Sequence, residues 1–210
     1  MFGLAPASLL TFMATAMFLA IAPGPDNLGV LSLGLSRGRR AAAGFAFGCA
    51  SGCLFHTVLA AVGVSALIAA SPSAFLALKL AGAAYLLYLA SKALRSNGGV
   101  SLQGEQGGDD AFLPYVRRGI LANVINPKVA LFFLAFLPQF VNGQYDAGAQ
   151  IMVLGLLFTV SAMLVFQSIA LFSGLIGNWL RQRQGVSLWL DRLTGLLFIG
   201  LAARLALAQR

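Results

Sequence analysis

The chain contains a series of apolar stretches of about 20 residues or more, the length that an α-helix needs to cross roughly 30 Å of hydrocarbon. Hydrophobic residues make up 59% of its 210 residues, and charged residues make up only 10%. An ordinary globular chain is roughly 45 to 50% apolar, so this chain has too little polar surface to face water throughout. Because the stretches are too long for the strands of an outer-membrane barrel, they predict an all-α membrane protein.

Six transmembrane helices are predicted, at roughly residues 5–35, 41–70, 73–94, 119–140, 148–178 and 186–208. The polar stretch 96–110 cannot bury apolar surface and is expected to belong to a linker. We therefore divide the chain into a first three-helix repeat, 1–95, a cytoplasmic linker, 96–118, and a second three-helix repeat, 119–210. Since each half has an odd number of spans, the two repeats must be inverted relative to each other, as in many secondary transporters. A five-span arrangement remains an alternative.

Basic residues predict the orientation of these spans. They flank the first-second, third-fourth and fifth-sixth connections: Arg37, Arg39, Arg40, Lys92, Arg95, Arg117, Arg118, Arg181 and Arg183. Cytoplasmic loops carry an excess of Lys and Arg, so we expect these three connections in the cytoplasm and both termini outside. The net charge of +8 thus fits a membrane topology. It does not fit nucleic-acid binding, which requires basic residues clustered on a polar face.

The first predicted span is interrupted near its middle by Pro23, Gly24, Pro25, Asp26 and Asn27. Proline removes a backbone donor and leaves carbonyl groups that lipid cannot satisfy. An ionised acid at the bilayer centre costs about 2.5 to 3.5 kcal/mol even on insertion scales. We therefore expect this break to face protein or a water-filled cavity, where it would form part of a transport site.

Asp26 is the only carboxylate well inside an apolar span. Burial disfavours a charged carboxyl group and a nearby cation favours it, so such a group can take up and release a proton near neutral pH. Asp26 is therefore the first candidate for binding a coupling ion, either a proton or Na⁺. The alternative is a fixed structural partner of Lys128 or of backbone amides.

A second break occurs at Asn126, Pro127 and Lys128 in the fourth span. The half-helix that follows it points free amides inward, and the helix dipole there favours anions. A zwitterionic ligand fits this arrangement, with its carboxylate on Lys128 and its ammonium on Asp26. The alternative for Lys128 is that its amine extends to the cytoplasmic interface. Asn27 and Asn123 either orient the ligand or satisfy the broken backbone.

The second span carries two patterns with helical spacing. Gly44, Gly48 and Gly52 form a face on which another backbone can approach closely, and that face also permits a homodimer.

The neighbouring face carries Cys49, Cys53 and His56, which could hold a soft metal or carry thiol chemistry, although the cysteines lack the Cys-x-x-Cys spacing. Packing is the simpler interpretation of the cysteines, while His56 could line a transport path. Gln167 in the fifth span could line the same path.

No enzyme is predicted. The sequence has no phosphate loop, no zinc His-Glu-x-x-His motif and no nucleophile elbow, and no cofactor is expected.

Four features together resemble the LysE/RhtB family of amino-acid exporters, which are bacterial inner-membrane carriers of about this length. They are the string Ala-Pro-Gly-Pro-Asp-Asn at 22–27, the glycine-spaced second span with His56, Asn-Val-Ile-Asn-Pro-Lys at 123–128, and Phe-Leu-Pro-Gln-Phe-Val at 136–141. The likeness covers nearly the whole chain. It implies six spans in the inner membrane, with periplasmic termini on the orientation above, and export of small amino acids or derivatives such as homoserine, threonine or lysine. It also implies coupling to the proton gradient.

Carried over by position, the family's signature falls on Pro23, Gly24, Pro25, Asp26, Asn27, Asn126, Pro127 and Lys128. Cys49 and Cys53 depart from the family's usual pattern. Because related groups carry metal ions or reducing equivalents, a metal-ion exporter or a thiol or electron carrier is the alternative function.

Overall fold

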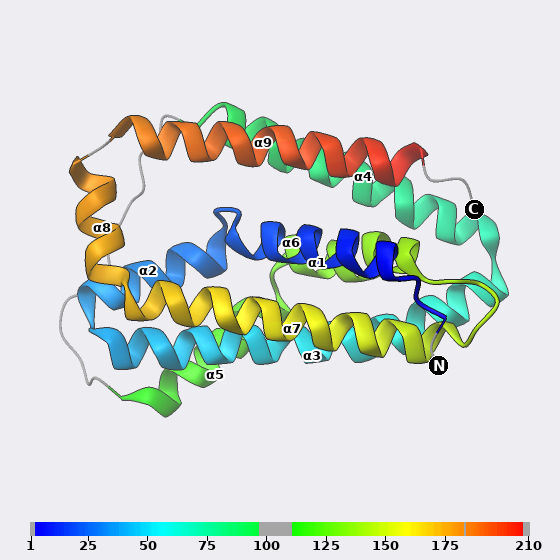
Figure 1. The fold of residues 1–210 in the computed structure, drawn as a ribbon, viewed down its shortest axis with the longest axis horizontal. Helices are drawn as coiled ribbons and strands as arrows, with labels where there is room; N and C mark the ends of the chain where they lie inside the picture. The colour runs from blue at the N-terminus through cyan, green and yellow to red at the C-terminus, as the bar shows by residue number, and fades with distance from the viewer. Residues whose placement is uncertain (1–2, 97–110, 183, 208–210) are drawn as a thin grey trace.

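The computed structural model describes residues 3–96, 111–182 and 184–207, and these form α-helices with no β-strand among them. Most of the helices run side by side along the long axis of the molecule (Figure 1). They are α1 (Pro6–Ile21), α2 (Pro25–Ser36), α3 (Arg39–Ala70), α4 (Pro72–Leu94), α5 (Phe112–Val124), α6 (Pro127–Leu131), α7 (Ala147–Leu171), α8 (Ser173–Gln182) and α9 (Gln184–Leu207). A π-helical turn, η1 (Phe132–Phe136), and a 3₁₀ turn, η2 (Leu137–Phe140), extend α6. The all-α prediction is confirmed.

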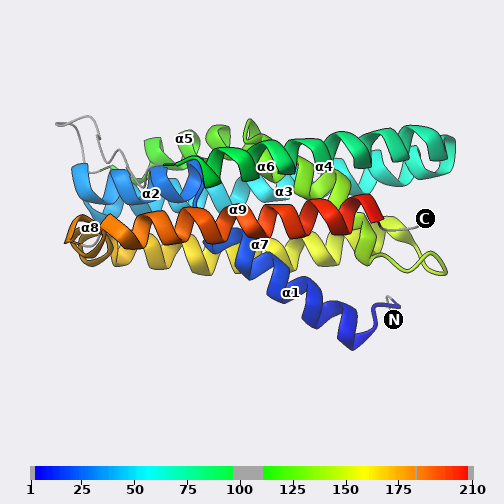
Figure 2. The ribbon, with the colours of Figure 1, turned by 90° about the horizontal axis from the view of Figure 1, so that it is seen from above.

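Three helices in the described part of the chain are long and apolar enough to cross a membrane, namely α3, α4 and α7. Two bent pairs meet the same test: α1 with α2, which bend by 48°, and α5 with Pro127–Phe140, which bend by 52°. The structure therefore supports up to five spans by length and composition, including both of the predicted broken spans. The predicted sixth span is the helix α9, which packs along α4 (Figure 2) but is not among these five candidates.

The chain runs back and forth between two ends of the bundle (Figure 1). The start of α1, the turn between α3 and α4, the start of α7 and the end of α9 lie at one end. The turn between α2 and α3 and the helix α8 lie at the other. This agrees with two termini on the same side, while the side on which they lie stays a prediction.

The predicted fifth span, 148–178, is not one helix. Its helix α7 ends at Leu171, and the chain then turns into α8, which lies across the end of the bundle (Figure 1). Gly177 lets α8 approach α2, because a Cβ there would lie 2.7 Å from the side chain of Leu35.

The fourth predicted span also differs at its start. It was expected from residue 119, whereas α5 begins at Phe112 and includes Arg117 and Arg118 in its helix. Arg118 lies over the ring of Tyr115, 5.4 Å from the centroid, so a cation within the helix keeps a partner. Residues 97–110 of the predicted linker lie outside the described residues.

The glycine face of α3 packs against α5 within the same chain. A Cβ on Gly44 or Gly48 would meet the backbone carbonyl of Phe112 or Val116, and one on Gly52 would meet the side chain of Asn123. The packing interpretation of this face is confirmed. The face that was expected to permit a homodimer is therefore occupied by the chain itself.

Candidate functional site

The break in the first span separates two regular half-helices. α1 ends at Ile21, and Pro25 begins α2. Proline lacks an N–H and excludes the preceding residue from the helical conformation, so Pro23 and Pro25 account for both boundaries. The intervening Gly24 is fully extended, with φ −171° and ψ 177°.

Asn27 satisfies the backbone that this break leaves open. Its Nδ2 donates to the carbonyl oxygens of Ala20 at 2.7 Å and Ile21 at 3.3 Å. Without this donor the buried carbonyl of Ala20 would lack a partner, which costs about 1 to 3 kcal/mol. Of the two roles predicted for Asn27, the structure thus places its amide on the broken backbone.

The break in the fourth span is held by Asn126. Its Oδ1 accepts from the backbone N–H of Lys128 at 3.1 Å and so caps α6, which begins at Pro127. The span then widens into the π-helical turn η1 before Pro138. Pro138 cannot donate to a residue one helical turn earlier, which explains why regular α-helix does not continue there.

The two breaks contact each other directly. Asn123 on α5 donates from Nδ2 to Oδ2 of Asp26 at 2.8 Å, and Lys128 on α6 donates from Nζ to the carbonyl of Ala22 at 3.0 Å. A Cβ on Gly24 would lie 3.0 Å from Nζ of Lys128, so the glycine gives the amine room to approach. Each broken span thus holds the charged group of the other.

A small buried cavity lies between the breaks. Its lining includes six of the predicted site residues: Gly24, Asp26, Asn27, Asn123, Asn126 and Lys128. The water-accessible volume is about 10 Å³, which is room for about one water molecule. Asp26 is 3% exposed and Lys128 7% exposed, so both ionisable groups are withdrawn from bulk solvent.

The two ionisable groups of the cavity have different partners. Oδ1 of Asp26 is buried and has no hydrogen-bond partner in the described part of the chain. Lys128 has the Ala22 carbonyl and the ring of Phe198 on α9, 5.8 Å from its Nζ to the ring centroid. The amine of Lys128 therefore points into the protein and does not extend to an interface.

Comparison with known proteins assigns the family. The family described as LysE type translocator matches residues 17–209, which include both breaks and the cavity between them. The chain belongs to the LysE family.

Relatives of this LysE-family chain extend over nearly its whole length. It is 35% identical to an uncharacterized membrane protein of Pseudomonas aeruginosa, with 94% of each chain covered. It is 31% identical to a homoserine/homoserine lactone efflux protein of Salmonella typhi, and the match covers 94% of this chain and 95% of the relative. It is also 31% identical to a leucine efflux protein of Enterobacter sp. (strain 638), with 93% of each covered. No solved structure matches.

Cys53 and His56 of this LysE-family chain surround Asn123. The thiol of Cys53 lies 3.8 Å from Oδ1 of Asn123, and Nε2 of His56 lies 3.1 Å from its backbone oxygen. His56 also stacks on Phe133, with the ring centroids 5.8 Å apart. Cys53 lines the cavity, whereas His56 supports the backbone behind it.

The metal and thiol alternatives gain little from this arrangement. Cys49 and Cys53 are both buried free thiols. Within the residues that the structure describes, no three His, Cys, Asp or Glu side chains are placed to hold a metal ion.

Gln167 does not line the cavity of the LysE-family site. Its Nε2 donates across to the backbone carbonyl of Ala43 on α3 at 3.0 Å, so it joins two helices. The sequence reasoning instead missed the apolar walls, which include Phe158 and Phe166 on α7 and Val129 on α6. Phe158 and Phe166 are eight residues apart and share one helix face, but core phenylalanines have the same spacing.

Proposed function

We propose that the chain is a secondary transporter of the bacterial inner membrane that exports a small amino acid or close derivative. The observation that carries the proposal is the meeting of two broken spans, which bring an acid and an amine to one buried cavity. The names of the relatives, homoserine/homoserine lactone efflux protein and leucine efflux protein, support the substrate class. Both broken spans cross the lipid bilayer.

A zwitterionic amino acid would be held by exchanging partners at this cavity. Its carboxylate takes the place of the Ala22 carbonyl on the amine of Lys128. Its ammonium group takes the open Oδ1 of Asp26. Charge-assisted hydrogen bonds of this kind are roughly twice as strong as neutral ones, so both contacts favour binding.

Substrate entry requires the cavity to open. The cavity has room for about one water molecule, which occupies about 30 Å³ in the liquid. Any amino acid is several times larger than that. The bends at the two breaks are the natural hinges, because the freed backbone there has no continuous helix to oppose rotation. The closed cavity is therefore the occluded conformation of an alternating-access cycle.

An inverted repeat would supply the two alternating conformations. Figure 1 supports it, because the matched elements of the two halves run in opposite directions. These pairs are α1 and α2 with α5 to η2, α3 with α7, and α4 with α9. The sixth span of this proposal is α9, and both termini are periplasmic.

Asp26 is the proposed coupling group, with a proton as the coupling ion and Na⁺ as the alternative. It is the only carboxylate that lines the cavity in the described chain, and one of its oxygens is open. A proton bound there would neutralise the acid before the site reopens, and an ammonium group would displace that proton.

Transport into inverted membrane vesicles tests the proposal. A panel of labelled amino acids, including homoserine, threonine, lysine and leucine, is offered to vesicles with and without an inside-acid pH gradient. We expect at least one to accumulate above vesicles lacking the chain, and to accumulate faster with the gradient. Uptake no higher than in the control for every amino acid would overturn the proposal.

A further inference from the structure

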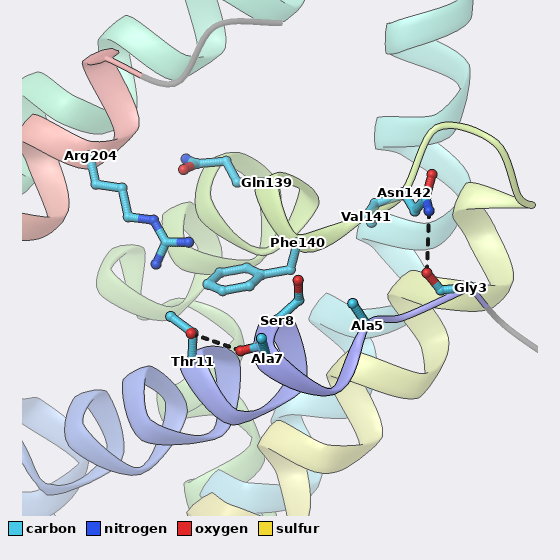
Figure 3. A pocket seen from close by; sticks show the side chains of 10 residues that line it. All are labelled: Gly3, Ala5, Ala7, Ser8, Thr11, Gln139, Phe140, Val141, Asn142 and Arg204. Carbon is cyan, nitrogen blue, oxygen red and sulfur yellow. Dashed lines mark hydrogen bonds between the residues drawn. The ribbon is translucent and has the colours of Figure 1, made fainter.

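A second, open pocket lies at the end of the bundle where α1 begins. Its volume is about 470 Å³, within the roughly 300 to 1,000 Å³ that ligand sites occupy, and it shares no lining residue with the central cavity. It is formed by the first turns of α1, the turn η2 and the end of α9 (Figure 3). Figure 2 shows α1 diverging from the other helices toward this end.

Arg204 supplies a cation to this pocket. Its guanidinium lies 4.5 Å from the ring centroid of Phe140 and 5.5 Å from that of Phe136. Figure 3 shows it extending from α9 toward Phe140 with Thr11 beyond it. Within the described residues Arg204 forms no ion pair. A guanidinium presents several donors in a planar fork that matches a carboxylate, so this residue is suited to an anionic ligand.

Gln139 supplies the complementary acceptor. Its Nε2 donates to the carbonyl of Ala135 at 3.2 Å, while its Oε1 is buried and has no partner in the described structure. An unsatisfied buried carbonyl is costly, and a ligand N–H would satisfy it. Figure 3 places the amide of Gln139 on the side of Arg204. An acceptor beside a cation fits the ammonium and the carboxylate of one zwitterion.

The start of α1 adds donors on the opposite wall. Ala5 stands at the N-cap position of this helix but makes no side-chain hydrogen bond, and Pro6 has no N–H. The next two backbone N–H groups, of Ala7 and Ser8, have no acceptor within their helix, and both residues line the pocket. These donors favour an anion on this wall of the pocket.

A chain of phenylalanine rings separates this pocket from the central cavity. Phe140 lines the pocket, and its ring centroid is 5.2 Å from that of Phe12. Phe12 is 6.4 Å from Phe132, and Phe132 is 4.8 Å from Phe158, which lines the central cavity. Both broken spans line the two sites, and α9 adds Arg204 to the outer one.

We propose that the open pocket is an outer binding site for the transported amino acid, and that the rings of Phe12, Phe132 and Phe140 form the gate between it and the central cavity. The inference rests on the proposed function. In the outer site the carboxylate binds Arg204 and the first turn of α1, and the ammonium group binds Oε1 of Gln139. The competing account is that Arg204 only fastens α9 to η2 by stacking on Phe140.

Protection from thiol labelling tests the outer site. Ser8→Cys places a reactive group on the wall of the pocket, while the two native thiols stay buried. The full chain is purified in detergent, and a polar maleimide is added with increasing concentrations of whichever amino acid the wild-type chain transports in vesicles. Protein without the Ser8→Cys substitution corrects for any labelling of the native thiols.

We expect the transported amino acid to slow the labelling, and the corresponding amine without a carboxylate to have little effect. Adding Arg204→Gln should raise the protecting concentration about tenfold or more, and Arg204→Lys should raise it less. Arg118→Gln is the matched control, since it also removes a guanidinium from an aromatic ring and lies outside the pocket. It should leave the protection curve unchanged.

Three outcomes would overturn the inference. Protection that is the same with Arg204→Gln would leave Arg204 only a stacking role. Transport by the wild-type chain without any protection at Ser8→Cys would remove the outer site and leave the proposed function intact. A wild-type chain that transports no amino acid would overturn the proposed function and the outer site together.

Discussion

The two broken spans bring opposite charges to one cavity, but they hold those charges differently. In the first span Asp26 has one oxygen bonded to Asn123 and one oxygen open. In the fourth span Lys128 is bonded to the Ala22 carbonyl and lies over the ring of Phe198. The acid therefore has one oxygen open to a hydrogen-bond donor, whereas the amine must give up a neutral partner to bind a carboxylate.

The backbones of the two breaks differ as well. The first break joins two regular half-helices, α1 and α2, through three residues. The second is followed by a π-helical turn and a 3₁₀ turn that continue to Phe140, which lines the outer pocket. Irregular helix of this kind is easier to rearrange than α-helix. We infer that the first break acts as a hinge and that the second also transmits movement toward the outer gate.

The largest expected effect comes from removing the amine. Lys128→Ala should lower transport by about 10²-fold or more, because it removes the cation for the carboxylate and leaves Asp26 as the only charge of the cavity. The measurement is initial uptake into vesicles at equal protein content. Lys92→Ala, which removes an exposed lysine on α4, is the control. If Lys128→Ala transports within threefold of the wild type, Lys128 does not bind the carboxylate, and the contrast drawn between the two spans is wrong.

Removing the acid should change coupling more than transport. Asp26→Asn keeps the shape of the side chain but removes its titratable group. The pH gradient should therefore no longer accelerate uptake. Exchange of labelled for unlabelled amino acid should persist within about tenfold, since one neutral hydrogen bond replaces one charged bond. Asp146→Asn at the start of α7 should behave as the wild type. An unchanged response to the gradient in Asp26→Asn would exclude it as the coupling group.

The contact between the spans should be visible in stability. Asn123→Ala leaves Oδ2 of Asp26 without its donor in a buried place, and we expect a loss of about 1 to 3 kcal/mol in the free energy of unfolding. Thermal unfolding of the purified chain measures the change. In the Asp26→Asn background the loss should shrink, because a neutral partner is cheaper to leave unpaired. Equal losses in both backgrounds would mean that the two side chains do not interact.

The smallest effect should follow from a methyl group at the first break. A Cβ on Gly24 would lie 3.0 Å from Nζ of Lys128, so the amine must move by a few tenths of an ångström. Since lysine has a flexible end, we expect Gly24→Ala to lower the apparent affinity in the uptake assay by only about threefold, roughly 0.7 kcal/mol. A complete loss of uptake by folded protein would show that Gly24 serves the hinge itself.

The sequence predicted the breaks well because their cause is local. Pro23, Pro25 and Pro127 prevent one continuous helix from running through these stretches, and a charge beside them in an apolar stretch indicates a site. The end of the fifth span at Leu171 was missed, since no proline marks it and the amphipathic α8 continues the helical pattern. Gln167 was expected at the site because it is polar and intramembrane, yet it bonds to Ala43. Which way a side chain points depends on packing between distant segments.

The outer pocket shows the same limit of sequence reasoning. Arg204 lies near the end of the last helix and Gln139 follows the second break, and nothing local connects them. The one available signal was that Arg204 falls at the end opposite the other basic clusters, an exception to the rule that predicted the orientation.

Alkylation of Cys53 tests most directly whether the cavity between the broken spans binds the substrate. This thiol lines the cavity and contacts Asn123, and Cys49→Ala removes the other native thiol. A small alkylating reagent is added to the purified chain with increasing amino acid. The account predicts protection that is half complete at the concentration that half saturates transport, with both values raised together by Lys128→Ala. Transport by the Cys49→Ala chain with no protection of Cys53 at saturating amino acid would contradict it.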